Sequence, residues 1–146
     1  MASEELSRRD RLLVSVVHSS SFLNILPTAI LYFTLGKSRS ASDPVTLTVW
    51  LIFFAGPAIG FLIWRFFRKR NHLWGSVQSL QATVFLILLS GLGLISIKVE
   101  ILDMVIVLGI FYGAWGTMDA LLGYNFKYIF IGTLAEKFVM NRMEHR

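Results

Sequence analysis

Four long apolar runs constrain this chain more than any other feature of its sequence. They cover residues 12–35, 47–67, 77–97 and 101–122. A helix rises about 1.5 Å per residue, so about 20 apolar residues cross the ~30 Å hydrocarbon core of a bilayer. The composition agrees, because 55% of the residues are hydrophobic and only 16% are charged. We therefore expect an all-α integral membrane protein, with one membrane domain and four transmembrane helices.

The first run could also be a cleaved signal peptide. Its flank, MASEELSRRDR, mixes acidic with basic residues, the run is longer than a signal core, and no small-residue cleavage site follows it. We therefore expect it to be a mature helix.

The basic residues indicate how the runs are oriented. Of the 14 Lys and Arg residues, eleven lie in the N-terminal segment, the loop between the second and third runs, and the tail. Short cationic loops stay on the cytoplasmic side of a membrane. We therefore expect two hairpins with both termini in the cytoplasm. Residues 124–146 carry apolar and charged residues at helical spacing, which predicts an amphipathic helix on the membrane surface.

The loop between the second and third runs concentrates positive charge. Its cations are Arg65, Arg68, Lys69 and Arg70. They are expected to set the topology, and binding of anionic lipid headgroups is the functional alternative.

Small residues recur at helical spacing in the second and fourth runs. They are Gly56 and Gly60 in the second run, and Gly109, Gly113 and Gly116 in the fourth. Spacings of three and four place small residues on one helix face, where another backbone can approach closely. We expect these glycines to pack helices together, with an oligomer interface as the alternative.

Four polar residues come to a similar depth in this topology: His18, Gln78, Gln81 and Asp119. Polar groups inside a membrane are costly, so they normally face the bundle and find partners. We favour interhelical hydrogen bonds for His18 and the glutamines, with Asp119 at the wet interface near Lys127. A His18–Asp119 proton or substrate relay is the sharper alternative. Ligation of haem or chlorin by His18 is a third, since one imidazole suffices.

The sequence excludes several classes of function. Cysteine is absent, which removes disulfides, thiolate catalysis and cysteine-held metal centres. No zinc-protease, nucleophile-elbow or phosphate-loop motif occurs, so no catalytic or metal-ligating residues are predicted. The net charge of +5 reflects loop clusters rather than a basic stripe, so no nucleic-acid partner is expected.

Three short segments carry a resemblance to a known family: DRLLVSVVHSS, VQSLQATVF and GYNFKYIFIG. Together they resemble small bacterial four-helix membrane proteins related to the channel-like subunit of the chloroplast Tic protein translocon. The matching positions are Asp10, Arg11, His18, Gln81, Ala82, Gly123, Phe126 and Tyr128. The sequence departs from the pattern at Ile129, where a proline is common, and in a longer first loop. The resemblance implies the four-helix fold, and a protein-conducting role for the plastid relatives.

We therefore expect a non-enzymatic, multi-pass protein of the bacterial inner membrane that serves as an accessory or structural subunit of a larger membrane complex. Its expected partners are anionic lipid headgroups and other membrane subunits. A Tic-like translocation or small-solute channel component is the first alternative. Pigment or haem binding through His18 within a bioenergetic complex is the second.

Overall fold

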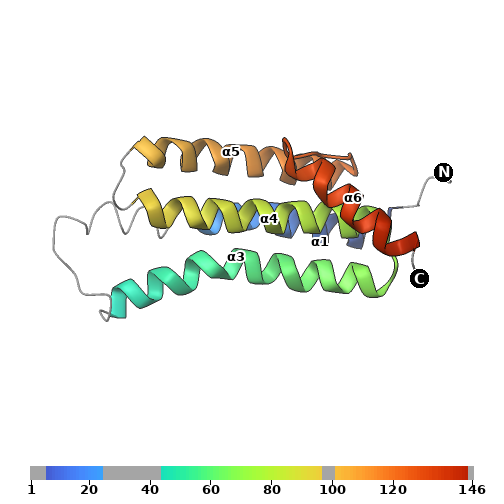
Figure 1. Ribbon diagram of the computed structural model, residues 1–146, viewed down its shortest axis with the longest axis horizontal. Helices are drawn as coiled ribbons and strands as arrows, with labels where there is room; N and C mark the ends of the chain where they lie inside the picture. The colour runs from blue at the N-terminus through green and yellow to red at the C-terminus, as the bar shows by residue number, and fades with distance from the viewer. Residues whose placement is uncertain (1–5, 25–43, 97–100, 145–146) are drawn as a thin grey trace.

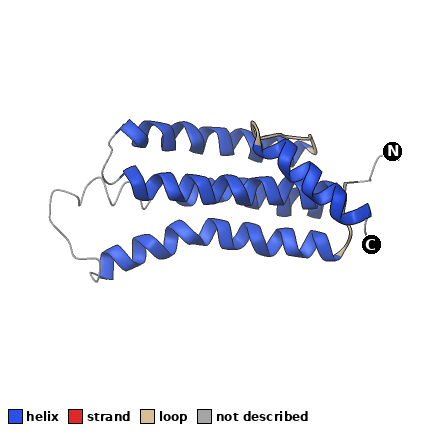
Figure 2. Cartoon of the chain, in the orientation of Figure 1, coloured by secondary structure: helices blue, strands red, loops and turns tan. Residues whose placement is uncertain are grey.

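The computed structural model describes residues 6–24, 44–96 and 101–144, and within these ranges the chain is all-helical, with no strand (Figures 1 and 2). The elements are α1 (Arg8–Ser19), the 3-10 helix η1 (Ser20–Asn24), α3 (Pro44–Lys69), α4 (Leu73–Ser96), α5 (Ile101–Leu122) and α6 (Ile131–Glu144). Helices α3, α4 and α5 run side by side, α1 lies behind α4, and α6 crosses the bundle at one end (Figure 1).

Helix α1 begins four residues earlier than the apolar run predicts. Ser7 is its N-cap and accepts a hydrogen bond from the Asp10 N–H at 3.1 Å, which satisfies a free donor of the first turn. The α-helix ends at Ser19, and the chain continues as the 3-10 helix η1. An unbroken α-helix was expected over 12–35. Hydroxyls of the serine run bond backbone carbonyls, Ser20 to Val16 at 2.8 Å for example, and such bonds compete with helix geometry. Residues 25–35 lie outside the described ranges.

The α3–α4 connection is a tight turn. Asn71 has a φ of +53°, a left-handed conformation that asparagine tolerates better than most residues. Directly after it, His72 Nδ1 accepts the Gly75 N–H at 3.0 Å and so caps α4. This cap explains why α4 begins at Leu73, four residues before the predicted start at 77.

Helix α5 has the bounds predicted for the fourth run, and it ends where Gly123 adopts a φ of +83°. The tail differs from its prediction. Residues 123–130, called the return segment below, are not helical, and the tail helix begins only at Ile131. In the return segment Phe126 and Tyr128 are buried while their neighbours in sequence are exposed, the period-two pattern of an extended chain. The chain therefore buries these two rings in an extended segment, where the first turns of a helix were expected.

Two stretches within the described residues are long and apolar enough to cross a membrane, Leu73–Gly93 and Met104–Leu122. They belong to α4 and α5, which pack as antiparallel neighbours, as their short connection predicts (Figure 1). The buried Ala135 and Val139 of α6 face α4, which leaves Leu134 and Phe138 exposed on the same apolar side.

Candidate functional site

The glycines of α5 create close approaches between helices. A Cβ on Gly116 would lie 2.6 Å from His18 Nδ1, and one on Gly109 would lie 2.7 Å from a Leu89 methyl group. A Cβ on Gly113 would collide with the Ser21 side chain. Glycine therefore lets α5 approach α1 closely enough for the His18 ring to lie against its backbone.

The glycines of α3 also allow neighbouring helices to approach closely. A Cβ on Gly56 would lie 3.3 Å from the Ser20 carbonyl oxygen, and one on Gly60 would lie 3.0 Å from a Val17 methyl group. Gly60 also abuts Thr83, so α1, α3 and α4 meet at this position.

Two glutamines of α4 hold the backbone of the return segment. Gln78 Nε2 donates to the Phe126 carbonyl oxygen at 3.0 Å, and Gln81 Nε2 donates to the same oxygen at 2.5 Å. Gln81 Nε2 also donates to Gln78 Oε1 at 2.7 Å. Both side chains are almost fully buried. The glutamines therefore satisfy a carbonyl that has no helix partner, which a buried backbone group requires.

Tyr112 of α5 holds the same segment from the other side. Its hydroxyl donates to the Lys127 carbonyl oxygen and accepts the Ile129 N–H, each at 3.3 Å. The return segment is thus bonded through its backbone to α4 and α5 together.

His18 joins this arrangement through Tyr128. Its Nδ1 lies 2.9 Å from the Tyr128 hydroxyl oxygen, the imidazole stacks on the Tyr128 ring, and it meets the Phe126 ring edge to face. Burial raises the pKa of the Tyr128 hydroxyl above its ordinary value. Gln78 neighbours the imidazole, but no hydrogen bond of ordinary geometry reaches the buried Nε2.

These residues form one unit, called the polar pin below: His18, Gln78, Gln81, Tyr112, Phe126 and Tyr128. Sequence spacing indicated His18 and the two glutamines. Phe126 and Tyr128 entered only through the family resemblance, and Tyr112 was missed. The alternation of polar and aromatic residues in NFKY, residues 125–128, is the sequence signal that could have identified an extended, inserted segment.

Asp119 is not part of the polar pin. Within the described residues, no hydrogen bond or ion pair joins its carboxylate to His18, Gln78 or Gln81. Gly116 and the buried Ala120 occupy the face of α5 that meets α1, so Asp119 lies half-buried beside that face. The expected depth match therefore did not bring the carboxylate to the imidazole. Lys127, its other expected neighbour, instead pairs with Glu136 at 2.6 Å.

The surroundings of His18 do not fit a haem or chlorin. The ring is fully buried, with Gly116 against one nitrogen and the Phe126 and Tyr128 rings around it. An axial ligand needs an open position for the macrocycle beside one ring nitrogen. The described residues also contain no group of three His, Asp or Glu side chains that could hold a metal ion.

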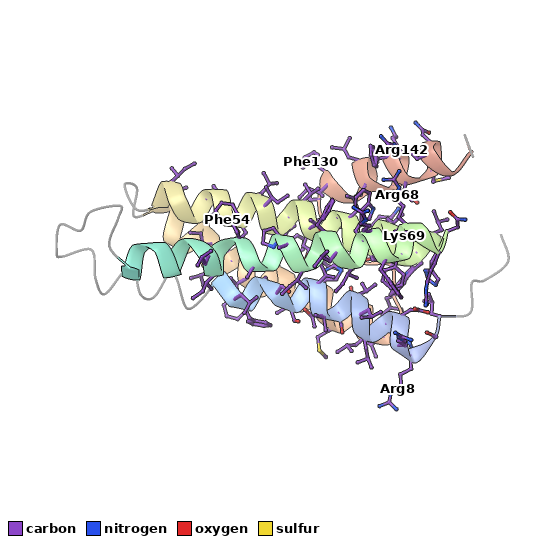
Figure 3. The ribbon with its side chains drawn as sticks, turned by 90° about the horizontal axis from the view of Figure 1, so that it is seen from below. Arg8, Phe54, Arg68, Lys69, Phe130 and Arg142 are labelled. Atoms are coloured by element: carbon purple, nitrogen blue, oxygen red, sulfur yellow. The ribbon has the colours of Figure 1, made fainter. Side chains whose placement is uncertain are left out.

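The basic residues lie at the end of α3. Arg65, Lys69 and Arg70 are exposed and Arg68 is half-buried. Arg68 and Lys69 are labelled at this end of α3 in Figure 3. The Arg68 guanidinium lies 5.3 Å from the Trp64 ring centroid and that of Arg70 lies 4.2 Å from the Phe66 ring centroid. Aromatic faces thus hold two of the four cations at this end.

Comparison with protein-family models, with curated proteins and with solved structures finds no match to this chain.

Proposed function

We propose that this chain is a non-enzymatic, multi-pass protein of the bacterial inner membrane that acts as an accessory subunit of a larger membrane complex. The outer face of α5 carries the proposal. Six large apolar side chains on it are between 59% and 70% exposed: Met104, Leu108, Phe111, Trp115, Met118 and Leu122. Only 28% of the span Met104–Leu122 is buried within the chain, whereas the core helix of a soluble protein is mostly buried. A face of this kind fits lipid or a partner helix.

The distribution of charge supports the topology of four spans in two hairpins with cytoplasmic termini. The start of α1, the α3–α4 turn and the end of α6 lie at one end of the bundle, and Arg8, Arg68, Lys69 and Arg142 lie there (Figure 3). The positive-inside rule assigns such an end to the cytoplasm.

The polar pin supports a structural rather than a catalytic role for His18 and the glutamines. Its amide donors are engaged with the backbone of the return segment, and its aromatic rings fill the space beside them. The arrangement holds the chain that links α5 to α6, and so positions α6 on α4.

Cysteine labelling tests the membrane topology, since the chain contains no cysteine. We expect an Asn71→Cys variant to react with a membrane-impermeant maleimide only after cells are lysed. A Ser40→Cys variant, in the loop after the first apolar run, should react when the outer face alone is accessible. The opposite labelling pattern, or equal labelling of both variants, contradicts the topology.

Gentle purification tests the role as a subunit. We expect the tagged protein, extracted in mild detergent, to migrate on a native gel with at least one other membrane protein. Migration solely as an isolated monomer, with unchanged helical content, contradicts the proposal.

One observation favours a Tic-like translocation or small-solute channel component as the second candidate. A cavity of about 430 Å³ reaches Gln78 and is also lined by Asn125, Lys127 and Glu136. This candidate predicts solute flux in proteoliposomes that falls in the variants Lys127→Gln and Asp119→Asn without loss of assembly. Sealed proteoliposomes without flux contradict it.

A further inference from the structure

A second pocket lies at the basic end of the bundle, between the end of α3, the first turns of α4, and α6. Its interior holds about 20 Å³, room for about one water molecule. Arg68 of α3 and Arg142 of α6 line it and lie at the same end of the molecule (Figure 3). Within the described residues, neither guanidinium forms an ion pair with a carboxylate. The pocket is therefore lined by two cations that no carboxylate of the described residues neutralises.

Both cations rest on aromatic rings that also line the pocket. The Arg68 guanidinium lies 5.3 Å from the Trp64 ring centroid, and that of Arg142 lies 5.0 Å from the Phe138 ring centroid. Stacking on a ring reduces the freedom of a long side chain, so the two charges are held at the pocket before a ligand arrives.

Two buried donors in the pocket lack partners. Among the residues that the structure describes, the Ser76 hydroxyl and the Trp64 Nε1–H have no hydrogen-bond partner, and Ser76 is only 1% exposed. An indole nitrogen can only donate, and a buried donor left unpaired is costly. Because both donor atoms are inaccessible from outside and the interior space is about 20 Å³, a water molecule is the acceptor that fits beside them.

An apolar groove continues from this pocket along the outside of the bundle. It is lined by Leu80 and Val84 of α4 and by Leu134 and Phe138 of α6, and Phe138 lines both the pocket and the groove. Ser76, Leu80 and Val84 follow at intervals of four, so one face of α4 leads from the unpaired hydroxyl into the groove. The charged pocket and the apolar groove therefore adjoin at Phe138.

We propose that this surface binds one anionic phospholipid. The phosphate lies at the mouth of the pocket between Arg68 and Arg142, and an acyl chain lies along the groove between α4 and α6. Guanidinium groups match phosphate oxygens in pairs, and the groove adds the apolar contact that a free phosphate would not use. The inference rests on the proposed function, because the groove faces acyl chains only in a bundle that spans the membrane.

Native mass spectrometry of the protein from nanodiscs tests the site. The nanodiscs contain phosphatidylglycerol mixed with phosphatidylcholine, and we expect phosphatidylglycerol to be retained selectively. Replacing both cations, Arg68→Gln with Arg142→Gln, should weaken its retention about thirtyfold, since each cation near a headgroup contributes several-fold. The matched control is Lys69→Gln with Arg70→Gln, which also removes two charges at the same end but outside the pocket, and should change retention by about twofold or less. Equal weakening by the control would show general surface attraction and overturn the proposal.

Two further arms separate a lipid from a free phosphate. Leu134→Gln places an amide in the groove at a side chain that is 67% exposed, so it should weaken phosphatidylglycerol retention while the protein stays folded. Glycerol 3-phosphate at millimolar concentration should compete poorly. Effective competition, with no effect of Leu134→Gln, would assign the pocket to a soluble phosphate and overturn the lipid proposal.

Whether the protein is integrated in the membrane is tested separately, by extraction with alkaline carbonate. If alkaline carbonate strips the protein from membranes, the proposed function fails and the lipid site fails with it. If the protein stays in the membrane but the double arginine variant retains phosphatidylglycerol normally, only the lipid site fails.

Discussion

The two halves of the bundle are held together by different interactions. Toward the α4–α5 connection, the buried core between these helices consists of Leu89, Ile106 and Ile110, with Phe85 and Leu92 packed against it. Toward the basic end, the polar pin lies in the interior, and His18 and Gln81 are fully buried. The core cluster of one half consists of apolar side chains, and the other half combines apolar contact with hydrogen bonds to a non-helical segment.

This difference has a physical consequence in a membrane. Acyl chains are as apolar as leucine, so apolar contact between helices gains only what close packing provides. Hydrogen bonds to the return segment depend on distance and angle, so they select one arrangement of α1, α4 and α5. The apolar half should therefore tolerate changes of shape, and the polar half should not.

The largest expected effect comes from filling the space beside His18. Gly116→Ala should lower the free energy of unfolding by about 3 kcal/mol, because the new Cβ would overlap the buried imidazole. The matched control is Gly91→Ala, since a Cβ there meets nothing within 4 Å. It should raise stability by up to about 1 kcal/mol through helix propensity. Unfolding in mixed detergent micelles measures both, and equal effects would remove the distinction between the two halves.

Removal of a glutamine should have the next largest effect. Gln81→Leu eliminates the donor to the Phe126 carbonyl and to Gln78 Oε1, and should cost about 2 kcal/mol. It should also raise hydrogen exchange at the start of α6, because the return segment loses part of its attachment. A loss of stability without faster exchange there would mean that the glutamines do not hold this segment.

Deleting the tyrosine hydroxyl should cost less. Tyr128→Phe keeps the ring packing but leaves His18 Nδ1 unpaired, at a cost of about 1 kcal/mol. In a double-mutant cycle with His18→Leu, the two effects should be less than additive, since the second substitution removes a group that the first has already orphaned. Additive effects would show that the His18–Tyr128 contact contributes nothing to stability.

The smallest effect is expected in the apolar half. Ile106→Val removes one methylene from a fully buried side chain and should cost about 0.5 kcal/mol, with hydrogen exchange of the return segment unchanged. A loss of stability as large as that of Gln81→Leu would show that the apolar half is as sensitive to changes of side-chain shape as the polar half.

Much of the helical layout follows from local sequence. The bounds of α5 match the apolar run at 101–122, because a run of that length ends at a glycine suited to a left-handed φ. The start of α4 was misplaced by four residues, since the cap at His72 uses a ring nitrogen rather than one of the usual short polar side chains.

The candidate site was predictable only in part. Polar residues in an apolar run must face the bundle, and this reasoning identifies His18, Gln78 and Gln81. Depth arithmetic could not place Asp119, because depth along a helix leaves its rotation unspecified. The rotation of α5 is set by Gly116 and Ala120 against α1.

The sequence by itself determined that the chain forms long apolar helices, with basic residues at one end and buried amides inside. It did so because helix length and side-chain periodicity are local properties. Only the tertiary structure decided that residues 123–130 fold back as an extended segment whose Phe126 carbonyl receives the two amides. The physical reason is that a non-helical backbone is stable inside a bundle only where distant side chains supply its hydrogen bonds.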